Sequence, residues 1–105
     1  IRALGLEPVV EAASSAEVER AVAAGSIIIG VNARDLSTFR VDMGAARECI
    51  ARSPAGCVAI FMSGIRSADD FREVASGRAD AVLIGEGLMR SEDPGARLFE
   101  LLGAV

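Results

Sequence analysis

Short apolar runs alternate with amphipathic segments along the whole chain. Each run is four or five residues long and rich in Val and Ile, which favours a strand over a buried helix. The runs that predict strands are Glu7–Glu11, Ile27–Val31, Val58–Met62 and Ala81–Ile84. Because the runs are continuous, they are typical of parallel strands that are buried on both faces. The high apolar fraction also fits a fragment that exposes one face to a partner.

A helical pattern follows each run. Ser14 and Glu17 have the spacing of a capping box, and Gly25 stands where a helix-terminating glycine belongs. The other predicted helices are Met43–Ala51 after the N-cap Asp42, Ala68–Ser76 after Ser67 with Gly77 at its end, and one opened by Asp93 and Pro94. The side chains expected to face inward are Phe71, Val74 and Ala75 in one helix and Leu98, Leu101 and Leu102 in the last.

The order of elements predicts an α/β fold of four βα units in one domain, residues 1–105. Strict alternation implies a parallel sheet with right-handed crossovers. Two architectures fit this pattern: a small open sheet, or half of a TIM (β/α)8 barrel, since a complete barrel needs about 250 residues.

Composition and charge exclude several classes of protein. The chain is 51% hydrophobic and 25% charged, which is typical of a globular domain. A net charge of −4 without a basic run argues against nucleic acid and anionic membranes as partners. No apolar stretch approaches the roughly 18 residues of a membrane span. Cys49 and Cys57 form no C-x-x-C pair and are interpreted as buried thiols of a cytoplasmic protein.

Lysine and histidine, two residue types that commonly supply acid–base groups, are absent from the sequence. All eleven basic residues are arginine, and there is no histidine. The chain therefore has neither the commonest general base nor an amine for a Schiff base, and no metal site is predicted. Any chemistry must use carboxylates, Asn, Ser, Cys and backbone donors.

Glycines follow the third and fourth predicted strands. Ser63–Gly64 ends one strand, and Gly85–Gly87 ends the next, just before the short apolar turn Leu88–Met89. Glycines let the backbone approach an anion, and a short helix at this place supplies N–H donors. Barrels commonly bind phosphate with these loops. The alternative is that the glycines serve tight turns only.

Polar residues end the first and second strands. Glu11 is either a surface charge or a site residue. Asn32 ends the second strand, where its amide can hold a hydroxyl or a carbonyl group. Arg34 can meet a carboxylate or phosphate with two hydrogen bonds, or it can pair with Asp35 or Asp42 to pin its loop. The length of that loop, between the second strand and its helix, indicates a functional role. Met62, at the end of the third strand, is interpreted as core filling or as a flexible apolar wall.

Several of these segments together resemble the indole-3-glycerol phosphate synthase family. They are Glu11 after Pro8-Val9-Val10, and the segments Ile29–Phe39, Ser63–Arg66 and Ile84–Met89, in the family's order and spacing. The similarity runs from Leu4 to Gly103. It implies strands five to eight of a (β/α)8 barrel and a carbon–carbon (carboxy) lyase reaction, a decarboxylating step of tryptophan synthesis. It also implies a cytoplasmic location and no metal or organic cofactor.

The resemblance also implies roles for individual residues. Glu11 and Asn32 match catalytic positions of the family. The positions that match substrate-binding residues are Arg34, Leu36 and Ser63, and those that match the phosphate cradle are Gly64, Gly85 and Glu86.

Two departures from the family pattern argue against activity. Met62 stands where the family has a glutamate before Ser-Gly-Ile, and the family's catalytic lysines belong to strands that this chain lacks. Loss of one general acid or base typically costs about 10²–10⁴ in rate. We therefore expect the chain to have no useful synthase activity by itself.

Two functional hypotheses follow. In the first, the chain is a synthase fragment that a missing N-terminal half-barrel completes. In the second, it is a non-catalytic half-barrel that self-associates into a barrel-like dimer, because a half-barrel leaves sheet edges unpaired. In both, the expected ligand is a phosphorylated small molecule, inorganic phosphate or sulfate. A sister barrel, such as phosphoribosylanthranilate isomerase, is disfavoured by the segment Asn32–Leu36.

Overall fold

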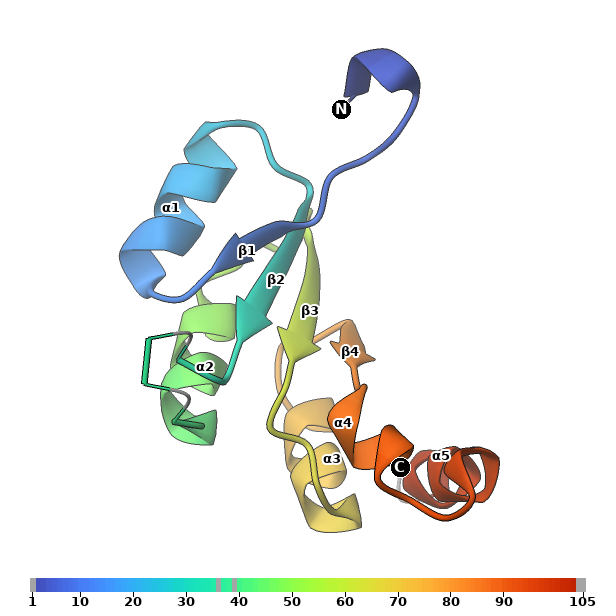
Figure 1. Ribbon diagram of the computed structural model, residues 1–105. Coiled ribbons are helices and arrows are strands. Elements are labelled where there is room, and N and C mark those ends of the chain that lie inside the picture. The colour runs from blue at the N-terminus through green and yellow to red at the C-terminus, as the bar shows by residue number, and fades with distance from the viewer. Residues whose placement is uncertain (1, 36, 39, 104–105) are drawn as a thin grey trace.

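The computed structural model of the chain describes residues 2–35, 37–38 and 40–103. It contains one sheet of four parallel strands in the order in which they occur in the sequence. The strands are β1 (Val10–Ala12), β2 (Ile28–Asn32), β3 (Val58–Met62) and β4 (Ala81–Leu83). Figure 1 shows the strands side by side, with a helix after each. The predicted α/β fold is confirmed, and the open sheet is consistent with half of a (β/α)8 barrel.

The helices begin where local sequence signals predict. They are η1 (Arg2–Leu4), α1 (Ser15–Ala23), α2 (Met43–Ala51), α3 (Ala68–Ala75), α4 (Glu86–Met89) and α5 (Pro94–Leu102). The side chains of Ser14, Asp42, Ser67 and Asp93 each accept a first-turn N–H, so the four predicted N-caps are confirmed. Gly25 ends α1 with φ +88°, a backbone conformation that favours glycine.

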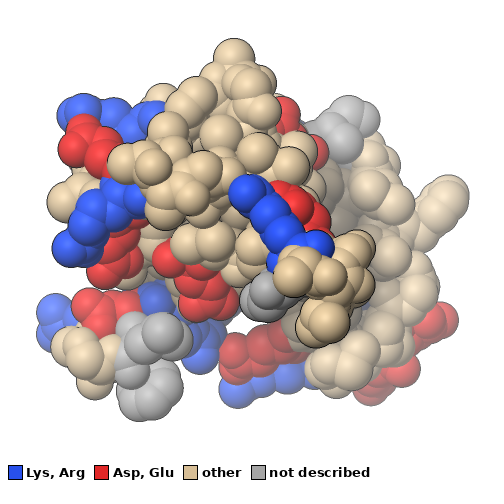
Figure 2. All heavy atoms as spheres, turned by 90° about the horizontal axis from the view of Figure 1, so that it is seen from above, with Lys and Arg blue, Asp and Glu red and all other residues tan. Residues whose placement is uncertain are grey.

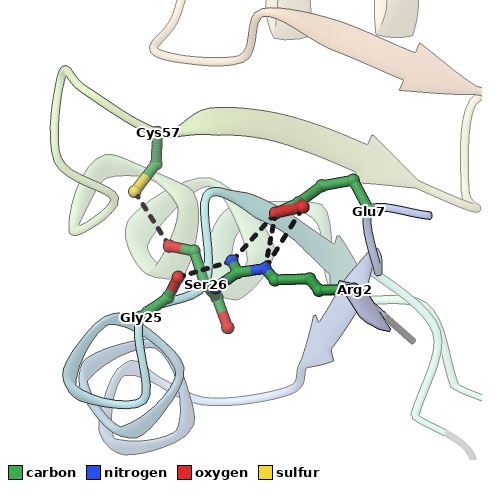
Figure 3. Close-up of polar contacts among 5 residues, drawn as sticks. All are labelled: Arg2, Glu7, Gly25, Ser26 and Cys57. Atoms are coloured by element: carbon green, nitrogen blue, oxygen red, sulfur yellow. Dashed lines mark hydrogen bonds and ion pairs between the residues drawn. The ribbon is translucent and has the colours of Figure 1, made fainter. Parts of the chain in front are cut away.

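The first strand differs from its prediction. Residues Glu7–Glu11 were expected to be extended, but β1 is Val10–Ala12 and pairs only with β2. Pro8 has no N–H with which to continue the ladder. The Glu7 carboxylate instead accepts from Arg2 Nη2 at 2.8 Å, and the same guanidinium donates to the carbonyl of Gly25 at 2.7 Å. Figure 3 shows Arg2 between Glu7 and Gly25, where it ties the N-terminal segment to the end of α1.

The two faces of the sheet have different surroundings. On one face Ile29, Ala59 and Phe61 are completely buried, because α1 and α2 pack against the strands there. On the other face, Val58 is 45% exposed and Leu83 is 56% exposed. Of the two alternatives, strands buried on both faces do not occur in the described chain, whereas a chain that exposes one face of its sheet agrees with the exposure of Val58 and Leu83.

Other expectations about burial have mixed outcomes. Phe71 and Val74 of α3 are buried, but Ala75 is exposed. In α5, Leu101 is buried, whereas Leu98 and Leu102 are 41% and 54% exposed.

Both cysteines are free thiols. Cys49 is buried and Cys57 is half-buried, with its thiol donating to the carbonyl of Ser26. No helix within the described residues is long and apolar enough to cross a membrane. Viewed from the side at which the strands begin, the surface has arginines interspersed with carboxylates rather than a continuous basic area (Figure 2).

Candidate functional site

A cavity of about 690 Å³ opens at the carboxyl ends of the strands. Seven of the eight predicted site residues line it: Glu11, Asn32, Arg34, Ser63, Gly64, Gly85 and Glu86. The eighth, Leu36, lies outside the described residues. The structure thus brings together residues from all four βα units, as expected where the carboxyl ends of parallel strands meet. Their individual roles stay predictions.

The turn after β3 forms one wall of the cavity. Ser63 and Gly64 have φ of +67° and +79°, so two successive residues adopt the left-handed conformation. A Cβ at Gly64 would lie 2.8 Å from Val41 Cγ1 and 2.9 Å from Met43 Sδ. Glycine is therefore required where this turn packs against the segment that leads into α2. Ser63 is a non-glycine residue in a strained conformation, a feature that concentrates at functional sites.

The short helix α4 forms the opposite wall. Its N-cap is Gly85, which supplies no side-chain acceptor, whereas the helices α1, α2, α3 and α5 are capped by Ser or Asp. The N–H groups of a first helical turn have no intrahelical partner. A Cβ at Gly87 would lie 2.9 Å from the carbonyl oxygen of Ile65. Glycine at this position thus allows α4 to approach the turn after β3 closely.

Asn32 and Arg34 are linked at the end of β2. The side-chain carbonyl of Asn32 accepts the backbone N–H of Arg34 at 2.9 Å. The amide is therefore engaged with its own loop through Oδ1, and its NH₂ group remains to donate. Arg34 also forms an antiparallel bridge with Val41, which closes the base of the loop.

The alternative in which Arg34 pairs with Asp35 or Asp42 does not occur, because its guanidinium donates to Glu86 instead. Asp42 caps α2 by accepting from Ala45. Asp35 accepts from the hydroxyl and N–H of Ser37 and the N–H of Thr38, and these hydrogen bonds lower the pKa of the Asp35 carboxyl. Both aspartates are thus occupied by donors of their own turns, which lie two or three residues further along the chain.

Glu86 bridges two arginines at the edge of the cavity. Its Oε2 accepts from Arg34 Nη2 at 2.8 Å, and its Oε1 accepts from Arg90 Nη2 at 2.7 Å. The hydrogen bond from Arg34, followed by the charge of Arg90, lowers the pKa of the Glu86 carboxyl. Glu86 is therefore ionised at neutral pH.

Two arginines of the cavity were not among the predicted site residues. Arg66 and Arg90 both line it. Arg66 belongs to the segment that follows Ser63, and Arg90 stands one helical turn after Glu86. The i,i+4 spacing of Glu86 and Arg90 was a signal that the sequence contained.

Glu11 and Met62 face the same cavity from neighbouring parts of the sheet. Glu11 is exposed on β1 and has no hydrogen bond or ion pair within the described chain. Met62 is 9% exposed, and its sulfur occupies the space beside Gly30 that a side chain there would fill. Met62 is thus buried and forms an apolar part of the cavity wall.

The described part of the chain contains no group of three His, Cys, Asp or Glu side chains placed to hold a metal ion. The polar groups of the cavity are guanidiniums, carboxylates, an amide, a hydroxyl and backbone N–H groups. These groups suit an oxyanion, because arginine forks and helical N–H groups both match its oxygens.

A parallel α/β half-barrel with its cavity at the carboxyl ends of the strands is the class of structure that these features define. Within this class, the sequence model of indole-3-glycerol phosphate synthase matches residues 1–101. The chain therefore belongs to the indole-3-glycerol phosphate synthase family.

Individual relatives agree with this assignment. The indole-3-glycerol phosphate synthase of Mycobacterium ulcerans is 44% identical over 105 residues, which cover 96% of this chain and 37% of that protein. Indole-3-glycerol phosphate synthase 1 of Streptomyces coelicolor is 44% identical over 101 residues, with 96% and 38% covered. The chain thus spans just over a third of the length of these relatives.

Solved structures with similar folds come from proteins with other names. The Amycolatopsis orientalis BexX/CysO complex contains a chain that superposes with a TM-score of 0.67 at 27% identity, over 98% of this chain and 46% of that one. A mandelate oxidase crystallised with benzoyl-formic acid superposes with a TM-score of 0.65 at 27% identity, covering 92% and 32%. In both, this chain corresponds to less than half of a longer chain.

Proposed function

We propose that this chain is the carboxyl-terminal part of an indole-3-glycerol phosphate synthase of tryptophan biosynthesis, a cytoplasmic carboxy-lyase. In this proposal it keeps the phosphate-binding portion of the active site and is inactive by itself. The observation that carries the proposal is the convergence of seven family-matched residues on one cavity. Family membership supports the reaction, and the free thiols of Cys49 and Cys57 support a reducing compartment.

Phosphate binding is supported by two sets of donors in the cavity. The uncapped first turn of α4 offers N–H groups, and Arg34, Arg66 and Arg90 supply positive charge. The phosphate of a substrate is expected between the turn after β3 and α4. Calorimetric titration of the chain with inorganic phosphate tests this. Absence of binding at millimolar concentration would contradict it.

The lack of activity follows from the groups that are missing. The sequence has no lysine and no histidine, and Met62 replaces a family glutamate at the end of β3. Of the two carboxylates that line the cavity, Glu86 is paired with arginines, whereas Glu11 has no ion pair in the described chain. One carboxylate without a general acid is not expected to drive decarboxylative ring closure at a useful rate.

A complementation experiment tests both the proposed synthase function and the proposed loss of activity caused by Met62. The chain is mixed with, or fused to, an N-terminal half-barrel of a family synthase, with Met62→Glu beside the parent. Formation of indole glycerol phosphate is expected with Met62→Glu and at least 10²-fold less with the parent. Equal activity of both would show that Met62 is not the defect, and activity of the chain alone would refute the proposed inactivity.

The second candidate function is a non-catalytic half-barrel that self-associates. It is favoured by the uncovered face of the sheet, where Val58 is 45% exposed and Leu83 is 56% exposed. Apolar side chains that cluster on one uncovered face are typical of interaction surfaces. Sedimentation velocity at micromolar concentration distinguishes the candidates, because a monomer that associates only with an N-terminal half-barrel supports the synthase fragment.

A further inference from the structure

A single carboxylate in the cavity occupies two of its three arginines. Glu86 accepts from Arg34 Nη2 at 2.8 Å and from Arg90 Nη2 at 2.7 Å. Arg34 belongs to the loop after β2, whereas Glu86 begins α4, 52 residues later. The Arg34–Glu86 pair therefore joins two walls of the cavity.

The guanidinium of Arg34 is only partly satisfied by this contact. Its Nη2 donates to Glu86, but its Nε is buried and has no acceptor within the described chain. The Nε and Nη groups of arginine form a planar fork that matches both oxygens of a carboxylate or two oxygens of a phosphate. In the contact with Glu86 only Nη2 of Arg34 donates, so the Nε donor of the fork is unused. A buried N–H donor without an acceptor is energetically unfavourable.

The charges around Glu86 favour an anion in its place. Arg66 lines the same cavity, and its guanidinium has no hydrogen bond or ion pair within the described residues. Its charge also contributes to the lowered pKa of Glu86. The Glu86 carboxylate is a negative charge between Arg34 and Arg90, so it would repel an oxyanion that binds to the same arginines.

We propose that the Glu86 carboxylate is an internal competitor, which holds the Arg34 guanidinium until an oxyanion replaces it with a two-point contact. The oxyanion is a phosphate or carboxylate group of a small ligand. Glu86 then keeps its ion pair with Arg90, because the Arg90 side chain is 78% exposed and can move together with the Glu86 carboxylate. This inference rests on the proposed anion binding by the cavity. It adds that the side chain of Glu86 opposes the ligand.

The test compares Glu86→Gln with Glu92→Gln in the 105-residue chain at low ionic strength. Both variants change the net charge equally, but Glu92 is exposed, lies outside the cavity and has no partner within the described residues. Inorganic phosphate is titrated calorimetrically into each. Glu86→Gln is expected to bind about tenfold more tightly than Glu92→Gln, mainly because the Arg34 fork is released and to a smaller extent because a repelling charge is removed. Circular dichroism checks that each variant is folded, and Glu86→Ala serves as a second variant.

A second comparison examines the two-point contact. Arg34→Lys keeps the positive charge but has no fork, so the gain from Glu86→Gln should shrink to about twofold or less in that background. The inference is overturned if the parent binds phosphate and both Glu86 variants bind no more tightly than Glu92→Gln. Full retention of the gain in the Arg34→Lys background likewise overturns the two-point exchange. If no variant binds phosphate, the proposed function fails together with the inference.

Discussion

The sulfur of Met62 on β3 lies against Gly30 on β2, in the position that a Cβ on Gly30 would take. Met62 pairs in register with Asn32, so the sulfur reaches back along the neighbouring strand by two residues on the same face of the sheet. The glycine thus makes room for the methionine. A smaller or shorter side chain at residue 62 would remove this requirement.

The first prediction concerns this contact. Gly30→Ala is expected to lower the free energy of unfolding by about 1–3 kcal/mol, since the new methyl group must displace the Met62 sulfur. Urea denaturation measures the loss. In a Met62→Ala background the same substitution should cost at least about 0.5 kcal/mol less, because the two residues are in contact. Equal costs in both backgrounds would contradict this packing.

The second prediction concerns the turn after β3. Gly64→Ala is expected to lower the free energy of unfolding by about 2–4 kcal/mol, because it combines a left-handed backbone with crowding against Val41 and Met43. Gly56→Ala is the matched control. A Cβ at Gly56 meets nothing within 4 Å and its φ is not in the left-handed region, so its effect should stay within about 0.5 kcal/mol.

The third prediction concerns the hydrogen bond from the Arg34 N–H to Asn32 Oδ1. Asn32→Leu removes the acceptor while nearly preserving side-chain volume. Phosphate affinity should fall about threefold to tenfold, the equivalent of one neutral hydrogen bond that positions the Arg34 loop. In an Arg34→Leu background the substitution should have no further effect on affinity. A comparable additional loss there would mean that Asn32 acts on the ligand directly.

The fourth prediction concerns pH and the start of β3. Asp80 accepts from Arg78 Nη1 at 2.6 Å and from the Ala59 N–H at 2.9 Å, and these contacts lower the pKa of its carboxyl. A folded-state pKa below the unfolded value of about 3.9 means that the stabilisation is present above that pH and is lost as pH falls through the folded pKa. Asp80→Asn should therefore lower the urea midpoint at pH 7.

The difference between Asp80→Asn and the parent should shrink as pH falls below about 4. Glu92→Gln is the control, since Glu92 has no partner in the described chain, and it should match the parent at neutral pH. A difference between Asp80→Asn and the parent that stays constant down to pH 2 would contradict an electrostatic origin.

Local signals in the sequence predicted the helices well. Each N-cap side chain accepts the N–H three residues later, so the start of a helix can be predicted from a single turn of sequence. The caps are Ser14, Asp42, Ser67 and Asp93. The bounds of β3 were predicted correctly, because Val58–Met62 is an apolar run between turn residues. The edge strand β1 was less predictable, since its length depends on which residues β2 can pair with.

Part of the candidate site could be predicted from the sequence. The glycines and polar residues at strand ends were predicted to meet, and they line one cavity. The sequence left the partner of Arg34 open, and the alternative of Asp35 or Asp42 does not occur because both aspartates accept from donors in their own turns. Arg90 was overlooked although its i,i+4 spacing from Glu86, itself a predicted site residue, was visible in the sequence.

The sequence by itself determined the alternation of strands and helices, the caps and the family, since these depend on residues near one another or on ordered motifs. Only the tertiary structure decided that Glu86 holds Arg34 and that Met62 fills the space beside Gly30. The physical reason is that these contacts join residues far apart in the chain. Their geometry depends on the register of the parallel strands, which no local pattern specifies.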